Sequence, residues 1–169
     1  IGAMDGFSPY YQDLIFSRLS QHLHPKHGRL YIVGLNPIPD KVDGDGQIIC
    51  EITKLRDACT LLAGHRCYRE FPLEWVQRNL LQNGYKVIAS SIFPILYSRD
   101  TIVRQLNVAR SKLPLFPSKQ LADSMSKQID ELEDRARKIL LQQNGQRIKV
   151  GFDYVVVAEL DNSRCSTPT

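Results

Sequence analysis

Three runs of mainly apolar residues predict the strands of a sheet: Leu30–Leu35, Tyr85–Ile95 and Ile148–Leu160. The first run is rich in β-branched and aromatic side chains, and it lies between a glycine turn and an Asn-Pro step. Because its polar and apolar positions do not alternate, it is typical of a strand buried on both faces of a parallel sheet. We therefore expect the rest of the chain to pack around Leu30–Leu35.

Between these runs, apolar residues recur every three or four positions, a spacing that predicts amphipathic helices. We expect helices over residues 9–23, 48–63, 72–83, 98–113 and 121–144, with Ser98 capping the fourth. Helices that alternate with strands are typical of an α/β fold. We expect one domain over residues 1–160, followed by a disordered tail over 161–169. The expected core includes Ile32, Val33, Trp75, Phe152 and Val155.

Composition and charge fit a soluble protein and give no specific nucleic-acid signal. The chain is 43% hydrophobic and has a formal charge of +4, but its lysines and arginines are dispersed and not interleaved with aromatic residues. A specific nucleic-acid module is therefore not indicated. The sequence shows no membrane-length apolar run, no secretory signal and no metal-ligand spacing of cysteines or histidines. We expect a cytoplasmic protein without metal or membrane association.

Three segments resemble class I S-adenosylmethionine-dependent methyltransferases. Residues 23–34 place leucine, proline and glycine before an apolar strand, as in the turn into the family's fifth strand. Residues 71–87 resemble the helix and glycine-aromatic step into its sixth strand, and residues 150–159 resemble its seventh. The resemblance covers residues 3–160. It implies the C-terminal part of a Rossmann-like sheet, in which parallel strands are joined by one antiparallel strand, Ile148–Leu160, inserted between the other two.

The resemblance also implies a site near the beginning of the chain. Ile1–Phe7 would be the end of the family's fourth strand and the following loop. Asp5 would then be a catalytic base or orienting residue, and Gly2 and Met4 would contact S-adenosylmethionine. In an alternative interpretation, Gly2–Gly6 is itself the glycine-rich cofactor loop, and Asn36 replaces the acidic residue that binds the ribose.

Tyrosines and an arginine are the candidates for the wall that contacts the methyl acceptor. These residues are Tyr10, Tyr11, Tyr68 and Arg69. A structural interpretation is also open for the last two, because they could cap helix ends and pair with Glu70.

The sequence leaves two classes of function open. The first is methyl transfer to an unidentified acceptor, with the cofactor-binding half of the family's domain largely absent from this chain. The second is a non-catalytic binding or scaffolding protein, which would use an exposed sheet edge for self-association or for a partner chain. A nicotinamide-dependent dehydrogenase is disfavoured because no Gly-x-Gly-x-x-Gly lies between a strand and a helix.

Overall fold

The computed structural model describes residues 2–142 and 146–161, which form a mixed α/β structure. The chain divides into two compact units, although we expected one domain. The sheet unit contains the chain up to Pro37, Tyr68–Phe93 and the chain from Phe152 onward. The helical unit contains Ile38–Cys67 and Pro94–Gly151. Apart from Asp161, the predicted tail lies outside the described residues.

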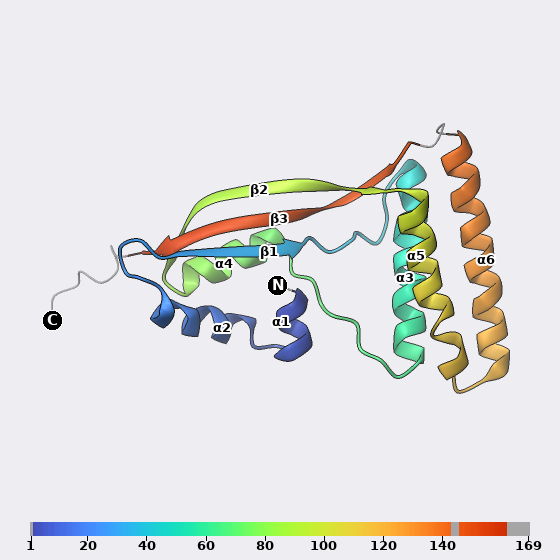
Figure 1. Ribbon diagram of the computed structural model, residues 1–169, viewed down its shortest axis with the longest axis horizontal. Coiled ribbons are helices and arrows are strands. Elements are labelled where there is room, and N and C mark those ends of the chain that lie inside the picture. The colour runs from blue at the N-terminus through green and yellow to red at the C-terminus, as the bar shows by residue number, and fades with distance from the viewer. Residues whose placement is uncertain (1, 143–145, 162–169) are drawn as a thin grey trace. The chain divides into compact units, whose positions relative to one another are not determined.

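The sheet contains three strands, β1 (Arg29–Leu35), β2 (Tyr85–Tyr97) and β3 (Ile148–Leu160), in the order β1-β3-β2 (Figure 1). β3 pairs antiparallel with β1, and Ile32 lies opposite Val156. The predicted position of the last strand, antiparallel and between the other two, is therefore confirmed. Because β3 separates β1 from β2, the three described strands form an antiparallel sheet, and the parallel pairing that we expected is not observed.

The core of the sheet unit lies on one face of this sheet. Alternate residues of β3 are buried together with residues of α2 (Gln12–Leu19) and α4 (Leu73–Gln82). The buried residues of this core are Phe16, Ile32, Val76, Leu80, Tyr85, Tyr154, Val156 and Ala158. Trp75 and Phe152 pack against it and are partly buried. Val155 is also only partly buried.

The prediction that β1 is buried on both faces is wrong. Ile32 is buried as expected, but Val33 is 59% exposed, and so is Tyr31. Their register partners on β3, Val155 and Val157, are partly buried. The error has a physical source, because an apolar run without alternation does not reveal which of its two faces a helix will cover.

The first residues are helical. Gly2–Phe7 forms α1, so the prediction of a strand end followed by a loop is wrong. The next helix, α2, begins at Gln12 and not at the Ser8-Pro9 step, and a short 3-10 helix, η1 (Ser20–His22), follows it. α2 buries Phe16, as expected, and Tyr11, which precedes the helix, is exposed.

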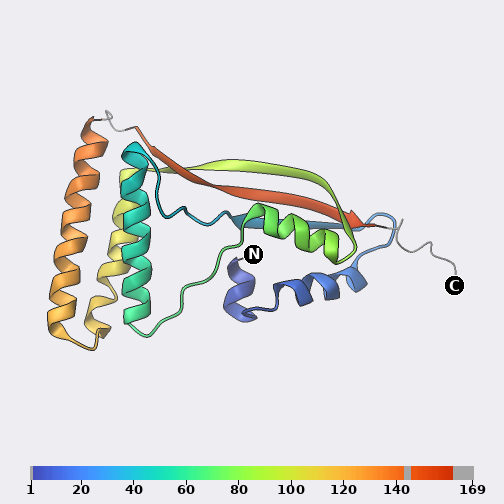
Figure 2. The ribbon, with the colours of Figure 1, turned by 180° about the vertical axis from the view of Figure 1, so that it is seen from behind.

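The helical unit contains α3 (Gln47–Leu62), α5 (Arg99–Arg110) and α6 (Lys119–Gln142), with short 3-10 helices η2 (Gly44–Gly46) and η3 (Leu113–Leu115) (Figure 2). The sequence predicted α3, α5 and α6, including the cap of α5, where Ser98 Oγ accepts a hydrogen bond from the Thr101 backbone at 3.3 Å. We expected the helices to flank the sheet. Instead, their apolar stripes form a separate core with Ile148 and Val150.

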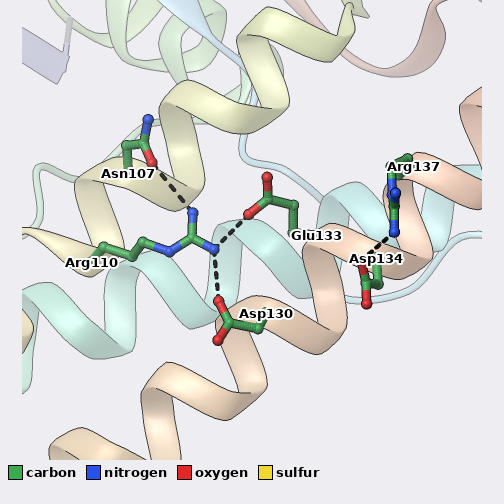
Figure 3. Close-up of polar contacts among 6 residues, drawn as sticks. All are labelled: Asn107, Arg110, Asp130, Glu133, Asp134 and Arg137. Carbon is green, nitrogen blue, oxygen red and sulfur yellow. Dashed lines mark hydrogen bonds and ion pairs between the residues drawn. The ribbon is translucent and has the colours of Figure 1, made fainter.

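An arginine network joins α5 to α6 in this unit. Arg110 Nη2 lies 2.8 Å from Asp130 Oδ1 and 2.5 Å from Glu133 Oε2, and Arg110 Nη1 donates to Asn107 at 3.3 Å (Figure 3). The neighbouring ion pair, Arg137 with Asp134, lies within α6 (Figure 3). None of the helices in the described part of the chain is long and apolar enough to cross a membrane.

Candidate functional site

Asp5 is a charged side chain that the sheet unit buries almost completely. Only 1% of its surface is exposed. Its carboxylate accepts hydrogen bonds from Arg69 Nη2 at 2.5 Å, from Arg69 Nε at 3.3 Å and from the Arg69 backbone at 3.1 Å. It also accepts one from Gln12 Nε2 at 3.0 Å. The predicted acidic residue and the predicted arginine are thus brought together, although 64 positions separate them in the sequence.

These hydrogen bonds determine the protonation of Asp5. The Arg69 side chain has the largest effect and, together with the Arg69 backbone and Gln12, lowers the pKa of Asp5 from 3.8 to about 2, although burial opposes the shift. A carboxylate with so low a pKa is a weak proton acceptor near neutral pH. Of the two roles expected for Asp5, the geometry therefore favours orientation of Arg69 over general base catalysis.

Tyr10 covers the same arginine. The Arg69 Cζ atom lies 3.4 Å from the centre of the Tyr10 ring, a cation–π contact. Tyr10 is 79% exposed, and its backbone has a φ of 66°, in the left-handed region that a non-glycine residue seldom adopts. Backbone strain of this kind costs on the order of 1 kcal/mol and often occurs at functional sites.

Two glycines of α1 make room for side chains of the segment that carries Arg69. A Cβ atom at Gly6 would lie 3.0 Å from Cε1 of the exposed Tyr68 ring, and a Cβ atom at Gly2 would clash with the Glu70 carboxylate. Gly6 thus lets α1 approach the Tyr68 ring closely, whereas the carboxylate near Gly2 is the end of a flexible side chain that can move aside. Met4, the other residue expected at the cofactor, packs against the core of the sheet unit.

Glu70 and Tyr154 extend the polar cluster, and sequence analysis did not assign either residue to the site. Burial raises the pKa of Glu70, whose carboxylate also interacts with the Leu35 backbone. The Tyr154 hydroxyl donates to the Phe71 carbonyl at 2.8 Å, and burial, followed by the charge of Glu70, raises the pKa of Tyr154. The interpretation in which Arg69 pairs with Glu70 is wrong, because Arg69 pairs with Asp5.

Sequence analysis selected Tyr11 for the site but overlooked its neighbour Gln12. Tyr11 is exposed, and the contacts described above do not include its side chain. Gln12, which sequence analysis missed, is only 3% exposed, and its Nε2 donates a hydrogen bond to Asp5. The available signal was a polar residue in the first turn of an amphipathic helix, on the side that faces α1 in the structure. Such a residue is usually solvent-exposed, and so it attracts no attention.

The described residues do not fit a cradle for S-adenosylmethionine. Such a cradle needs free backbone amides in a glycine turn and a side chain that accepts from the ribose. Gly2 lies in α1 against Glu70, and Asn36 Oδ1 accepts a hydrogen bond from the Leu73 backbone at 3.1 Å at the start of α4. The alternative with a cofactor loop over Gly2–Gly6 is therefore wrong, because these residues are helical.

The arrangement can bind a polar ligand next to aromatic surface. Arg69 uses Nε and Nη2 to hold Asp5, and a guanidinium carries five N–H donors in total. The Arg69 side chain is 37% exposed. The exposed Tyr10 ring lies over it, and the exposed Tyr68 precedes Arg69 in the chain. Such a surface can bind an oxygen-bearing group and a flat apolar group together.

Comparisons with known proteins give weak structural matches. No protein-family model and no curated protein matches the chain. A solved structure of a candidate sarcosine dimethylglycine methyltransferase from Galdieria sulphuraria matches with a TM-score of 0.35 and 13% identity, over 88% of this chain and 48% of that one. The YcgJ protein from Bacillus subtilis matches with a TM-score of 0.38 and 21% identity, over 86% of this chain and 56% of that one. The chain thus spans about half the length of these two solved proteins, and its similarity to them is too low to assign a family.

Proposed function

We propose that this chain forms the acceptor-side part of an S-adenosylmethionine-dependent methyltransferase domain. The observation that carries the proposal is the strand order β1-β3-β2, with β3 antiparallel between the other two. The sequence resemblance required this order. A sheet in which each strand pairs with the next one in the chain would have the order β1-β2-β3 instead. The helices α2 and α4, which precede β1 and β2, share one core with the sheet, as the same resemblance requires.

In this proposal the acceptor contacts Arg69, Tyr10 and Tyr68. Arg69 donates hydrogen bonds to an oxygen of the acceptor, and the tyrosine rings contact its apolar part. Asp5 is a positioning residue, since it holds the guanidinium without facing solvent. Tyr11, which is exposed and follows Tyr10 in the chain, stays a candidate for the same surface.

The proposal assigns the cofactor to no residue of this chain, because Gly2, Met4 and Asn36 have other partners. When bound, S-adenosylmethionine supplies an activated methyl group, and the protein has to align the acceptor with it. We therefore expect the 169-residue chain to bind S-adenosylmethionine weakly or not at all. The full product of the same gene is expected to bind it at micromolar concentration.

Titration calorimetry with S-adenosylmethionine on both proteins tests this function. A transfer assay with radiolabelled methyl groups follows, using panels of amine, hydroxyl and carboxylate acceptors. Binding by the full product together with transfer to an acceptor would support the proposal. Absence of cofactor binding and transfer with both proteins would overturn it.

The acceptor surface has its own test. Arg69→Lys keeps a cation but loses the two-pronged contact with Asp5, and we expect it to raise the KM for the acceptor about tenfold at similar kcat. Arg78→Lys makes the same exchange at an exposed arginine of α4 outside this surface and is the matched control, with a KM within about twofold of the parent. An unchanged KM in Arg69→Lys would remove Arg69 from the acceptor surface.

A second function is favoured by one observation. Tyr31 and Val33 leave apolar surface exposed on the face of β1 that carries no helix of the sheet unit, a feature that often marks interaction surfaces. A binding or scaffolding protein would need such a surface. It is the function that remains if the full product neither binds the cofactor nor transfers a methyl group.

A further inference from the structure

Exposed aromatic side chains occur where two segments of the sheet unit meet. We call residues 6–11 and 68–69 the aromatic patch. Two contacts join its segments, because Gly6 lies against the Tyr68 ring and the Tyr10 ring lies over the Arg69 guanidinium. The exposed rings are those of Phe7, Tyr10, Tyr11 and Tyr68, of which Phe7 is 91% exposed. Exposed apolar surface of this kind often marks a binding site.

The Tyr10 ring is already one layer of a stack. Arg69 Cζ lies 3.4 Å from the centre of this ring, and 79% of Tyr10 is exposed. A guanidinium and a phenol ring are both planar, so a third planar group can stack on the face of Tyr10 that points away from Arg69. A flat ring fits this position better than a puckered or branched group.

The contact between Tyr10 and Arg69 disfavours a cationic ligand. A cation binds over an aromatic ring because the ring face carries partial negative charge. The Arg69 guanidinium already uses this property of Tyr10. An ammonium group on the other face of the same ring would also be repelled by the guanidinium, since like charges repel strongly at such short range.

Asp5 disfavours an anionic ligand. Its carboxylate accepts hydrogen bonds from Nε and Nη2 of Arg69 and so offsets the charge of the guanidinium. The wider segments 2–13 and 65–70 contain three acidic and two basic residues, a formal charge of −1 with histidine counted as neutral. The patch therefore has no excess of positive charge to attract a phosphate or a carboxylate.

We propose that the aromatic patch binds a neutral, planar aromatic molecule that carries an oxygen. This inference rests on the proposed function, in which that molecule is the methyl acceptor. Its ring stacks on Tyr10, and its oxygen accepts a hydrogen bond from Arg69, which has five N–H donors and uses Nε and Nη2 for Asp5.

Nuclear magnetic resonance titration of the 169-residue chain tests the inference without the cofactor. The probe is 2-naphthol. Three analogues each change one property: decahydro-2-naphthol lacks the flat ring, 2-naphthoate is an anion, and 2-naphthylmethylammonium is a cation. We expect 2-naphthol to bind at least about threefold more tightly than each analogue and to shift the amide signals of the aromatic patch.

Matched variants locate the bound ring. Tyr10→Leu and Phe7→Leu each remove an exposed ring of the patch and should weaken binding of 2-naphthol at least about threefold. Tyr31→Leu and Phe93→Leu make the same exchanges at exposed rings of β1 and β2, and both should bind within about twofold of the parent. Circular dichroism should show the same secondary structure in all four variants.

Three results would overturn the inference: equal binding of 2-naphthol and decahydro-2-naphthol, tighter binding of a charged analogue, or equal losses in patch and control variants. Titration calorimetry with S-adenosylmethionine tests the proposed function separately. Selective binding of 2-naphthol by the patch would support the aromatic site even if neither protein binds the cofactor. Methyl transfer that is equally efficient with aliphatic and aromatic acceptors would overturn the aromatic site and leave the proposed function in place.

Discussion

Asp5 couples the stability of the sheet unit to pH. Its pKa is lowered in the folded chain from 3.8 to about 2, chiefly by the Arg69 side chain. A depressed folded pKa adds stability above the unfolded pKa, and this stability is lost as pH falls through the folded value. We therefore expect the contribution of Asp5 to be complete near neutral pH and to disappear between about pH 4 and pH 2.

Urea unfolding from pH 2 to pH 7, followed by the fluorescence of Trp75, measures this contribution. Asp5→Asn should lower the midpoint near neutral pH and converge with the parent at the acid end. Asp123→Asn, which changes an exposed carboxylate of α6, is the control and should follow the parent. A constant difference between Asp5→Asn and the parent over the whole range would contradict the assigned pKa.

Asn36 is expected to stabilise the start of α4. Pro72 occupies the cap position and has no side chain that can accept a hydrogen bond, and Asn36 Oδ1 instead accepts from the Leu73 backbone. Asn36→Ala should cost about 1 kcal/mol of unfolding free energy, measured by chemical denaturation. Asn36→Asp keeps the acceptor and places a negative charge at the helix N-terminus, so it should be neutral or slightly stabilising. Equal losses of unfolding free energy in Asn36→Ala and Asn36→Asp would show that the hydrogen bond accepted at position 36 does not stabilise the protein.

At the scale of the element, β1 offers a comparison between its two faces. Ile32 is buried in the core of the sheet unit, and the adjacent Val33 is exposed on the other face. Ile32→Asp should cost several kcal/mol because it buries an unpaired charge, on the order of 4 or more. Val33→Asp should cost less than about 1 kcal/mol, which reflects strand preference alone.

Chemical denaturation of both β1 variants provides the measurement. Similar midpoints for Ile32→Asp and Val33→Asp would mean that the two faces of β1 do not differ in burial.

The bounds of some elements could be predicted, but the partners of these elements could not. The run Ile148–Leu160 and the 24-residue length of α6 match the structure, because alternation and helical periodicity are properties of a few neighbouring residues. The apolar positions of a helix or strand do not identify the element that packs against them. Ile102 and Leu106 belong to the core of the helical unit and not to that of the sheet unit. Val33 is exposed although its run is apolar throughout.

The sequence identified most residues of the site one by one but not the contacts between them. Asp5, Tyr10, Tyr68 and Arg69 were each identified as residue types that suit a site, and the structure places contacts between Asp5, Arg69 and Tyr10. Their pairing was not predictable, because it depends on a turn with positive φ and on α1, where a loop was expected.

At the scale of the whole molecule, each unit has its own core. The buried residues around Ile129 belong to the helical unit, and those around Tyr154 belong to the sheet unit. Separate cores are expected to unfold as separate cooperative units. The single tryptophan, Trp75, lies in the sheet unit, whereas α3, α5 and α6 supply most of the helical signal.

Urea unfolding should therefore give different midpoints for Trp75 fluorescence and for the far-ultraviolet helix signal. Coincident transitions with one midpoint would mean that the two units unfold together.

β3 belongs to both cores, with Ile148 and Val150 in one and Tyr154, Val156 and Ala158 in the other. Gly151 lies where the strand passes from one unit to the other, with a φ of 70°. Side chains alternate along a strand, so the deletion of one residue from β3 would turn inward-facing side chains outward, and outward-facing ones inward, on one side of the deletion. Insertions and deletions accumulated during evolution should therefore fall in segments such as 37–46 and 111–118, whereas the length of β3 should be inherited unchanged.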